Sequence, residues 1–195
     1  MVPVISKIIS GGQTGVDRGA LEAALELGFP YGGMIPRGRR AELSPADVEA
    51  GREEGMVPLC FDQMVEAFSP NYLYRTEQNV RRSDATLIID HADSISRQRG
   101  FKVPDNLTGG TLKTWRFAIE HRKPCLVMTT ANIPSVLKWL AECREKGRVP
   151  ADRGVVLNVA GPRESRVPGI QVKTKSFVMR LIRAVRAAEE QEAQA

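Results

Sequence analysis

The chain has 195 residues, of which 42% are hydrophobic and 26% are charged, and its formal net charge is +5. These values are ordinary for a soluble globular protein, and no uncharged apolar stretch approaches the roughly 20 residues that a membrane-spanning helix needs. The composition therefore argues against a membrane protein, and we expect a single cytoplasmic domain over residues 1–195.

The cysteine, histidine and aromatic content narrows the range of partners. The three cysteines are widely spaced and His91 and His121 lie far apart, so we expect no metal site. The positive net charge favours anionic partners, but only 6% of the residues are aromatic, which leaves little for stacking on bases. We expect an anionic small molecule as ligand rather than nucleic acid.

Apolar runs rich in β-branched residues alternate with helical patterns along the chain. The expected strands are residues 4–9, 31–35, 56–61, 85–90, 125–128 and 155–159. The expected helices are residues 19–27, 44–54, 71–82, 112–122, 135–146 and 176–190, and the tail 188–195 is expected to fray. Pro58 would confine the third strand to an edge or a bulge. Residues 91–107 form a long polar loop of the kind that serves as a binding lid or is simply mobile.

This alternation predicts an α/β fold, a doubly wound and mostly parallel sheet with helices on both faces. Two glycine-rich turns follow the first and fourth expected strands: the first glycine turn, residues 10–17, and the second glycine turn, residues 108–111. In the common doubly wound order these two strands are neighbours. We therefore expect both turns to open onto one crevice at the carboxyl edge of the sheet.

The first glycine turn reads Ser-Gly-Gly-Gln-Thr-Gly-Val-Asp, and neither G-x-G-x-x-G nor a P-loop is present. A strand that breaks at glycines and restarts as a helix directs free backbone N–H groups at one spot, which suits phosphate or another oxyanion. The candidate ligand-binding residues here are Gly11, Gly12, Gln13, Thr14 and Gly15. In the alternative interpretation the glycines serve only a tight strand-to-helix turn.

The second glycine turn repeats this arrangement with a threonine at each end. Its candidate binding residues are Thr108, Gly109, Gly110 and Thr111. Thr111 could instead be no more than the N-cap of the following helix, and the two roles are compatible.

Four charged residues are further candidates. Asp17 either caps its helix or accepts from a ligand hydroxyl or ring nitrogen, and Arg37, after the second strand, either binds an oxyanion or is a solvated loop residue. Arg163 follows the last strand and is either a third anion contact or part of a salt bridge. Glu77 and Asp17 are the candidate catalytic carboxylates, although a glutamate in such a position is more often a solvated or ion-paired helix residue. No Ser-His-Asp or Cys-His pattern emerges.

Several segments together resemble one family, known as the "putative molybdenum-cofactor carrier proteins". They are residues 8–18, 36–42, 72–88, 108–111 and 157–165, in order along nearly the whole chain. The resemblance implies a Rossmann-like fold, a homo-oligomer, and binding of molybdenum cofactor, a pterin with a phosphate. The wider superfamily is similar to phosphoribohydrolases that release a base from a nucleoside monophosphate. Residues 108–114 are shorter than their P-G-G-x-G-T-x-x-E motif and lack its glutamate.

Together these patterns favour a binding or carrier protein for a phosphorylated, ring-containing small molecule, with molybdenum cofactor (molybdopterin) as the leading ligand and a nucleotide-like ligand otherwise. The alternatives are an enzyme that cleaves the N-glycosidic bond of a nucleoside monophosphate, and a nucleotide-sensing module.

Overall fold

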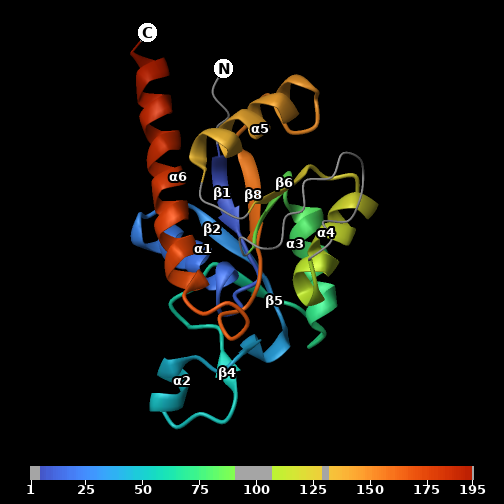
Figure 1. Cartoon of the computed structure of the whole chain (residues 1–195), viewed down its shortest axis with the longest axis vertical. Coiled ribbons are helices and arrows are strands. Elements are labelled where there is room, and N and C mark those ends of the chain that lie inside the picture. Colours follow the sequence, from blue (N-terminus) through green and yellow to red (C-terminus); the bar gives the residue numbers. More distant parts are fainter. Residues whose placement is uncertain (1–4, 91–106, 129–131, 195) are drawn as a thin grey trace.

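The structure is a computed structural model that describes residues 5–90, 107–128 and 132–194. Within these residues, six parallel strands form one sheet in the order β5-β2-β1-β8-β6-β7 (Figure 1). The strands are β1 (Ile5–Ile9), β2 (Tyr31–Ile35), β5 (Met64–Glu66), β6 (Ala85–Ile89), β7 (Cys125–Met128) and β8 (Val155–Ala160). The predicted α/β, Rossmann-like fold with a parallel sheet is confirmed.

Helices cover both faces of this sheet. They are α1 (Val16–Glu26), α3 (Tyr72–Arg82), α4 (Gly109–Glu120), α5 (Ile133–Glu145) and α6 (Ile170–Ala193). Figure 1 shows α1 and α6 packed together on one side of the sheet and α3 and α4 together on the other. Because both faces are covered, the interior strand β6, with the sequence Ala-Thr-Leu-Ile-Ile, is buried at every position.

The strand order differs from the expected one in the middle of the sheet. The first and fourth expected strands, β1 and β6, are not neighbours, because the last strand, β8, lies between them and pairs with both. Ile8 of β1 is in register with Leu157 of β8. The expectation that β1 and β6 are adjacent was wrong. Strand β8, which begins about 70 residues after the start of β6, lies between them, and no local pattern in the sequence signals this position.

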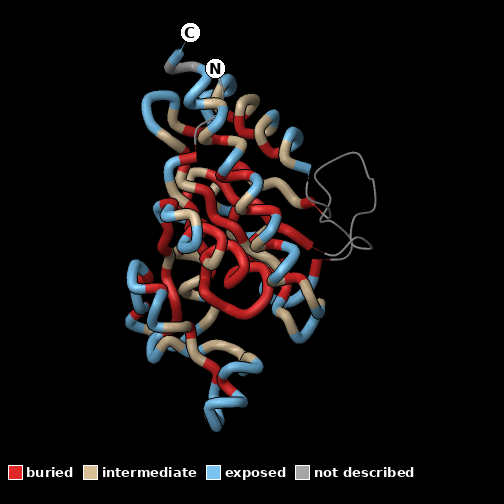
Figure 2. The backbone as a smooth tube through the Cα atoms, turned by 90° about the vertical axis from the view of Figure 1, so that its left-hand side faces the viewer, coloured by how far each residue is buried: buried red, intermediate tan, exposed pale blue. Residues whose placement is uncertain are grey.

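An arm leaves the body between β2 and β5. It holds the short 3-10 helix η1 (Arg37–Arg39), the antiparallel pair β3 (Arg40–Ala41) and β4 (Gly55–Met56), and the helix α2 (Pro45–Glu49). It projects from the lower end of the molecule in Figures 1 and 2. Its helix begins as expected, because Ser44 and Asp47 cap each other's backbone amides and Pro45 starts the first turn.

Two expected elements of this region were wrong. The helix expected over residues 44–54 ends at Glu49, and Gly51 follows with a φ of +66°. The strand expected over residues 56–61 ends at Met56, the last residue of β4, and the rest is irregular chain and turn, in which Arg39 Nη2 donates to the carbonyl of Pro58 over 2.8 Å. Pro58 has no amide to give to a ladder. The third strand of the sheet is instead β5, Met64–Glu66.

The last helix also differs from its expected range. It begins at Ile170 rather than at residue 176, and it continues through Ala193 where fraying from residue 188 was expected. The alanine, glutamate and glutamine residues of this stretch have high helix propensity, so the helix has no local reason to end. The loop expected over residues 91–107 lies, except for Leu107, outside the described residues. In the described part of the chain no helix is both long and apolar enough to span a membrane.

Candidate functional site

A pocket of about 270 Å³ opens at the carboxyl edge of the sheet, where the helices change from one face to the other. Four segments meet there: both glycine turns, the first half of α3 and the turn that follows β8. Residues of the two glycine turns thus line one pocket, although β8 separates their strands. The described lining consists of Gln13, Asp17, Tyr72, Leu73, Arg75, Thr76, Thr114, Arg166 and residues 108–111 and 160–163.

The second glycine turn is open. Gly109 and Gly110 are exposed, a Cβ added to Gly110 would meet no atom within 4 Å, and α4 begins at Gly109 with Thr108, not Thr111, as its N-cap. Among the described residues, none accepts a hydrogen bond from the amides of residues 109–111. The positive end of α4 therefore presents free N–H groups to the pocket.

An arginine lies beside these amides. Arg166 Nη1 is 3.7 Å from the position that a Cβ on Gly109 would occupy. Arg166 is exposed, and no carboxylate of the described residues lies within salt-bridge distance of it. Backbone N–H groups at a helix N-terminus together with a guanidinium form a binding site for phosphate or another oxyanion.

The first glycine turn is closed by protein atoms. A Cβ on Gly11 would lie 1.6 Å from Arg75 Nη1, one on Gly12 would lie 2.9 Å from Val57, and one on Gly15 would lie 2.4 Å from the carbonyl oxygen of Pro162. None of these three glycines lines the pocket in the described structure. They allow close packing within the protein.

The amides at the start of α1 also have partners. The Gly15 amide donates to Gln171 Oε1 over 3.1 Å, and the Val16 amide donates to the carbonyl of Pro162 over 3.2 Å. The helix therefore has little unmet capacity for an anion at this end.

Glu42 ties the first glycine turn to the turn after β8. Its carboxylate accepts from the hydroxyls of Thr14 and Ser165, each over 2.6 Å. Burial raises the pKa of Glu42, but the hydrogen bonds from Ser165 and Thr14 and the charge of Arg163 outweigh it and hold the pKa below its ordinary value. Thr14 thus faces Glu42 and lies outside the pocket lining.

A buried ion pair forms the inner wall of the pocket. Asp17 is 5% exposed, and its Oδ2 lies 3.2 Å from Arg75 Nη1 on α3. Burial raises the pKa of Asp17, although the charge of Arg75 opposes the change. The Nε atom of Arg75 is buried without a hydrogen-bond partner in the described part of the chain.

Arg163 lines the pocket from the turn after β8. Its guanidinium carbon is 5.6 Å from the centre of the Tyr72 ring, and Nη1 is 4.0 Å from Glu42 Oε2. The cation–π contact spans from the turn after β8 to the start of α3. Both readings of Arg163 that the sequence left open, an anion contact and a salt bridge, are compatible with this position.

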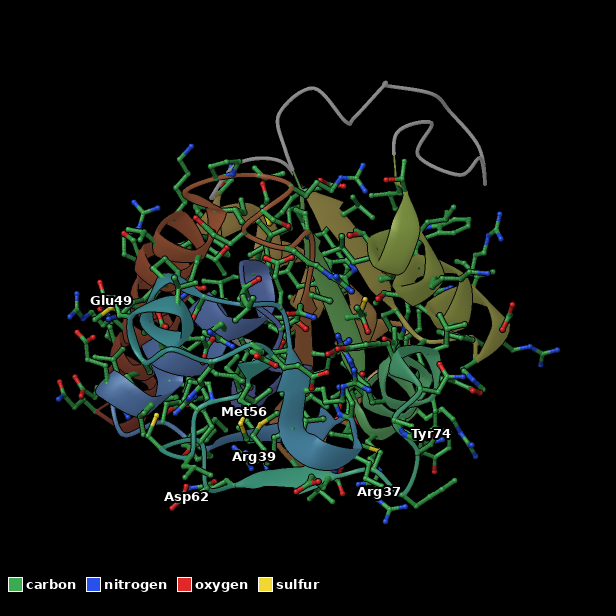
Figure 3. All side chains as sticks on the ribbon, turned by 90° about the horizontal axis from the view of Figure 1, so that it is seen from below. Arg37, Arg39, Glu49, Met56, Asp62 and Tyr74 are labelled. Carbon is green, nitrogen blue, oxygen red and sulfur yellow. The ribbon has the colours of Figure 1, made fainter. Side chains whose placement is uncertain are left out.

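Arg37 and Glu77 do not reach the pocket. Figure 3 shows Arg37 at the periphery of the molecule, pointing outward. Glu77 Oε1 lies 2.9 Å from Nε2 of His121, so this pair links α3 to the end of α4. Glu77 is therefore hydrogen-bonded to a neighbouring helix and does not line the pocket.

The sequence interpretation missed Arg75, Tyr72 and Arg166 as lining residues. Arg166 lies three residues beyond Arg163 in the turn after the last strand, which is at the carboxyl edge, so its position was available as a signal. The sequence gives no such signal for Arg75, because an arginine in a polar helical stretch is usually exposed to solvent. No group of three or more histidine, cysteine or carboxylate side chains within the described residues is arranged to hold a metal ion.

Comparison with known proteins found a family model and a solved structure that are similar to this chain. Residues 8–182 match the model of a family described as "Circularly permutated YpsA SLOG family". The chain is also similar to a crystal structure, at 1.45 Å resolution, of a "putative molybdenum carrier protein" from Syntrophus aciditrophicus SB. The two share 35% sequence identity over 93% of this chain and 97% of the other, with a TM-score of 0.71. None of the curated proteins matches the chain.

Proposed function

The chain belongs to the circularly permutated YpsA SLOG family, and we propose that its pocket binds and carries a phosphorylated, ring-containing small molecule. The observation that carries this proposal is the open end of α4, where the free amides of residues 109–111 lie beside Arg166. These N–H groups and the guanidinium need a negatively charged group with acceptor oxygens, and a terminal phosphate is such a group.

The rest of the pocket suits a ring. Its volume of about 270 Å³ is near the lower limit of the roughly 300–1,000 Å³ typical of small-molecule sites. Tyr72 and Leu73 supply apolar surface, and Gln13, Asp17 and Arg75 supply polar groups. A ligand with an anionic end and a polar heterocycle satisfies both parts.

Molybdenum cofactor is the leading named ligand, because the relative of known structure is named a "putative molybdenum carrier protein". Its phosphate fits the end of α4, and Gly109, Gly110, Thr111 and Arg166 would hold it there, with Arg163 nearby. The pterin would lie toward Gln13 and Asp17. As the cargo of a carrier, the cofactor would supply its chemistry only to an enzyme that receives it.

A second candidate function rests on Asp17. A buried carboxylate with a raised pKa in a pocket is a candidate general base. It would activate water to cleave the N-glycosidic bond of a nucleoside monophosphate. The ion pair with Arg75 favours the carrier, because it holds the carboxylate against a guanidinium and away from water.

A thermal-shift panel of pterin phosphates, nucleoside monophosphates and pyrophosphate tests the proposal. A ligand at 100 times its Kd adds about 2.7 kcal/mol of stability, so the melting temperature rises measurably. We expect Arg166→Gln to weaken binding of phosphorylated ligands at least about tenfold, and the matched control Arg183→Gln, at an exposed position on α6, to leave it unchanged.

Two further results would decide against the carrier. The absence of any shift with every phosphorylated ligand would remove it, and release of free base from a nucleoside monophosphate, lost in Asp17→Asn, would replace it by the hydrolase. The predicted homo-oligomer is checked by light scattering on the purified chain.

A further inference from the structure

The side chain of Gln13 is held in one orientation inside the pocket wall. It is 5% exposed, and its Oε1 accepts two backbone hydrogen bonds, from Thr14 over 3.0 Å and from Glu42 over 2.7 Å. Rotating the amide by 180° would place its NH₂ group against these two N–H donors. The hydrogen bonds therefore determine which atom is the oxygen and which is the nitrogen.

This orientation leaves the Nε2 of Gln13 without a partner. Nε2 is buried and has no acceptor within hydrogen-bond distance in the described part of the chain. Gln13 lines the pocket, so a ligand bound there is the available source of an acceptor. A buried donor without an acceptor raises the free energy of the ligand-free protein. A ligand atom that accepts from it removes this cost and so strengthens binding.

The same pocket also has a carboxylate acceptor in its lining. Asp17 lines the same pocket, and the backbone amide of Gln13 is close enough to the Asp17 carboxylate to lower its pKa. An ionised carboxylate has about four lone-pair directions, and hydrogen bonds from Arg75, the Gln13 amide and Ser10 take up three of them. The inner wall thus contributes an N–H donor and a carboxylate acceptor to the same pocket.

Building on the proposed function, we propose that this inner wall selects rings with a lactam edge, in which a ring carbonyl accepts from Gln13 Nε2 and the adjacent ring N–H donates to Asp17. Oxo-purines and pterins have such an edge. Adenine has the opposite pattern, an amino group next to an unprotonated ring nitrogen. It would set a donor against Nε2 and an acceptor against the carboxylate.

Two nucleotides that differ mainly in this edge provide the test. Inosine monophosphate has the lactam edge and adenosine monophosphate has the reverse, while the phosphate, the ribose and the ring size are the same. We expect calorimetry on the full chain to give a Kd at least about tenfold lower for inosine monophosphate, because mispaired buried polar groups are costly. An equal or tighter Kd for adenosine monophosphate would overturn the inference.

A variant adds an independent readout. Gln13→Glu keeps an oxygen for the amides of Thr14 and Glu42 and, when its carboxyl is ionised, replaces the Nε2 donor by an acceptor, so at pH 8 the preference for inosine monophosphate should disappear or reverse. Binding of pyrophosphate, which has no ring, should stay within about twofold. A parallel loss for both nucleotides and pyrophosphate would mean that Gln13 only supports the fold, against the inference.

The two proposals fail in different ways. If neither nucleotide, nor a pterin phosphate, nor pyrophosphate binds, the proposed function is wrong. If pyrophosphate binds and the two nucleotides bind equally, the phosphate site stands and the lactam selection is wrong.

Discussion

The two glycine turns look alike in the sequence and differ in the structure. In the first turn every residue from Ser10 to Asp17 is buried, and the glycines contact Arg75, Val57 and Pro162. In the second turn Thr108, Gly109 and Gly110 are exposed, and their backbone faces the pocket. Glycine thus allows protein to approach closely in one turn and leaves room for a ligand in the other.

The two turns therefore contribute different groups to the pocket. The first turn brings β1, the turn after β8 and α3 together, and it contributes side chains, Gln13 and Asp17, to the pocket. The second turn contributes backbone amides. We therefore expect changes in the first turn to lower stability, and changes in the second turn to leave stability nearly unchanged and to alter ligand binding.

The largest expected effect comes from Gly15→Ala. The new Cβ would lie 2.4 Å from the Pro162 carbonyl oxygen, and Gly15 has a φ of +82°. Overpacking against backbone and an unfavourable dihedral each cost about 1–3 kcal/mol, so we expect a loss of about 4 kcal/mol in the free energy of unfolding. Urea denaturation measures it. A loss below about 1 kcal/mol would mean that the turn is not closed.

The next effect concerns the buried ion pair. Arg75→Met leaves the Asp17 carboxylate buried without its cation, and we expect a loss of about 3 kcal/mol at pH 7. The matched control is Arg153→Met, which breaks the exposed pair with Asp84 and should cost about 1 kcal/mol or less.

The stability that Arg75→Met loses relative to the parent should depend on pH. Burial raises the pKa of Asp17, and removal of Arg75 raises it further, so the folded variant binds a proton more readily than the unfolded chain. The variant should therefore lose stability, relative to the parent, as the pH rises through the folded-state pKa of Asp17 in the parent, which lies above the ordinary value of 3.8. Equal losses at pH 4 and pH 8 would contradict a charged Asp17 at the inner wall.

A smaller effect is expected at Glu42, which connects the first turn to the pocket. Glu42→Gln weakens the hydrogen bonds from Thr14 and Ser165, and we expect a loss of about 1 kcal/mol at pH 7. Because the folded pKa of Glu42 is lowered, this stabilisation is present above the ordinary value of 4.5 and is lost as the pH falls through the folded pKa. Thermal unfolding between pH 3 and pH 7 should show the two proteins converging toward low pH.

The smallest effect on stability is expected in the second turn. Gly110→Ala adds a Cβ that meets nothing within 4 Å, at a helical residue without a positive φ. We expect a change within about 1 kcal/mol, and a gain rather than a loss, because alanine favours the helix. A loss comparable to that of Gly15→Ala in the same urea experiment would show that the second turn is packed like the first.

The sequence predicted those parts of the fold that have a local signal. The β-branched runs of β1, β6 and β8 gave their strands, and Ser44 with Pro45 gave the start of α2. The position of β8 between β1 and β6 had no such signal, because strand order depends on contacts between distant residues. The short strand β5 was missed, since three residues carry too little pattern.

The site was predictable in its place and less so in its residues. The carboxyl edge of the sheet and the second glycine turn followed from the strand-turn-helix pattern. The closure of the first turn did not, because it depends on Arg75 and Pro162, which are far from Gly11 and Gly15 in sequence. The partner of Glu77 was equally out of reach, since His121 lies on another helix.

The pairing of β1 with β8 has a consequence for how the chain is made. Strand β1 is synthesised before its neighbour β8, residues 155–160, which at ordinary rates of synthesis follow about 10–30 s later. During this time the backbone N–H and C=O groups on that edge of β1 are open to pairing with other chains. Such a long-range closure makes folding slow, and a nascent chain that stops before residue 155 lacks the centre of its sheet.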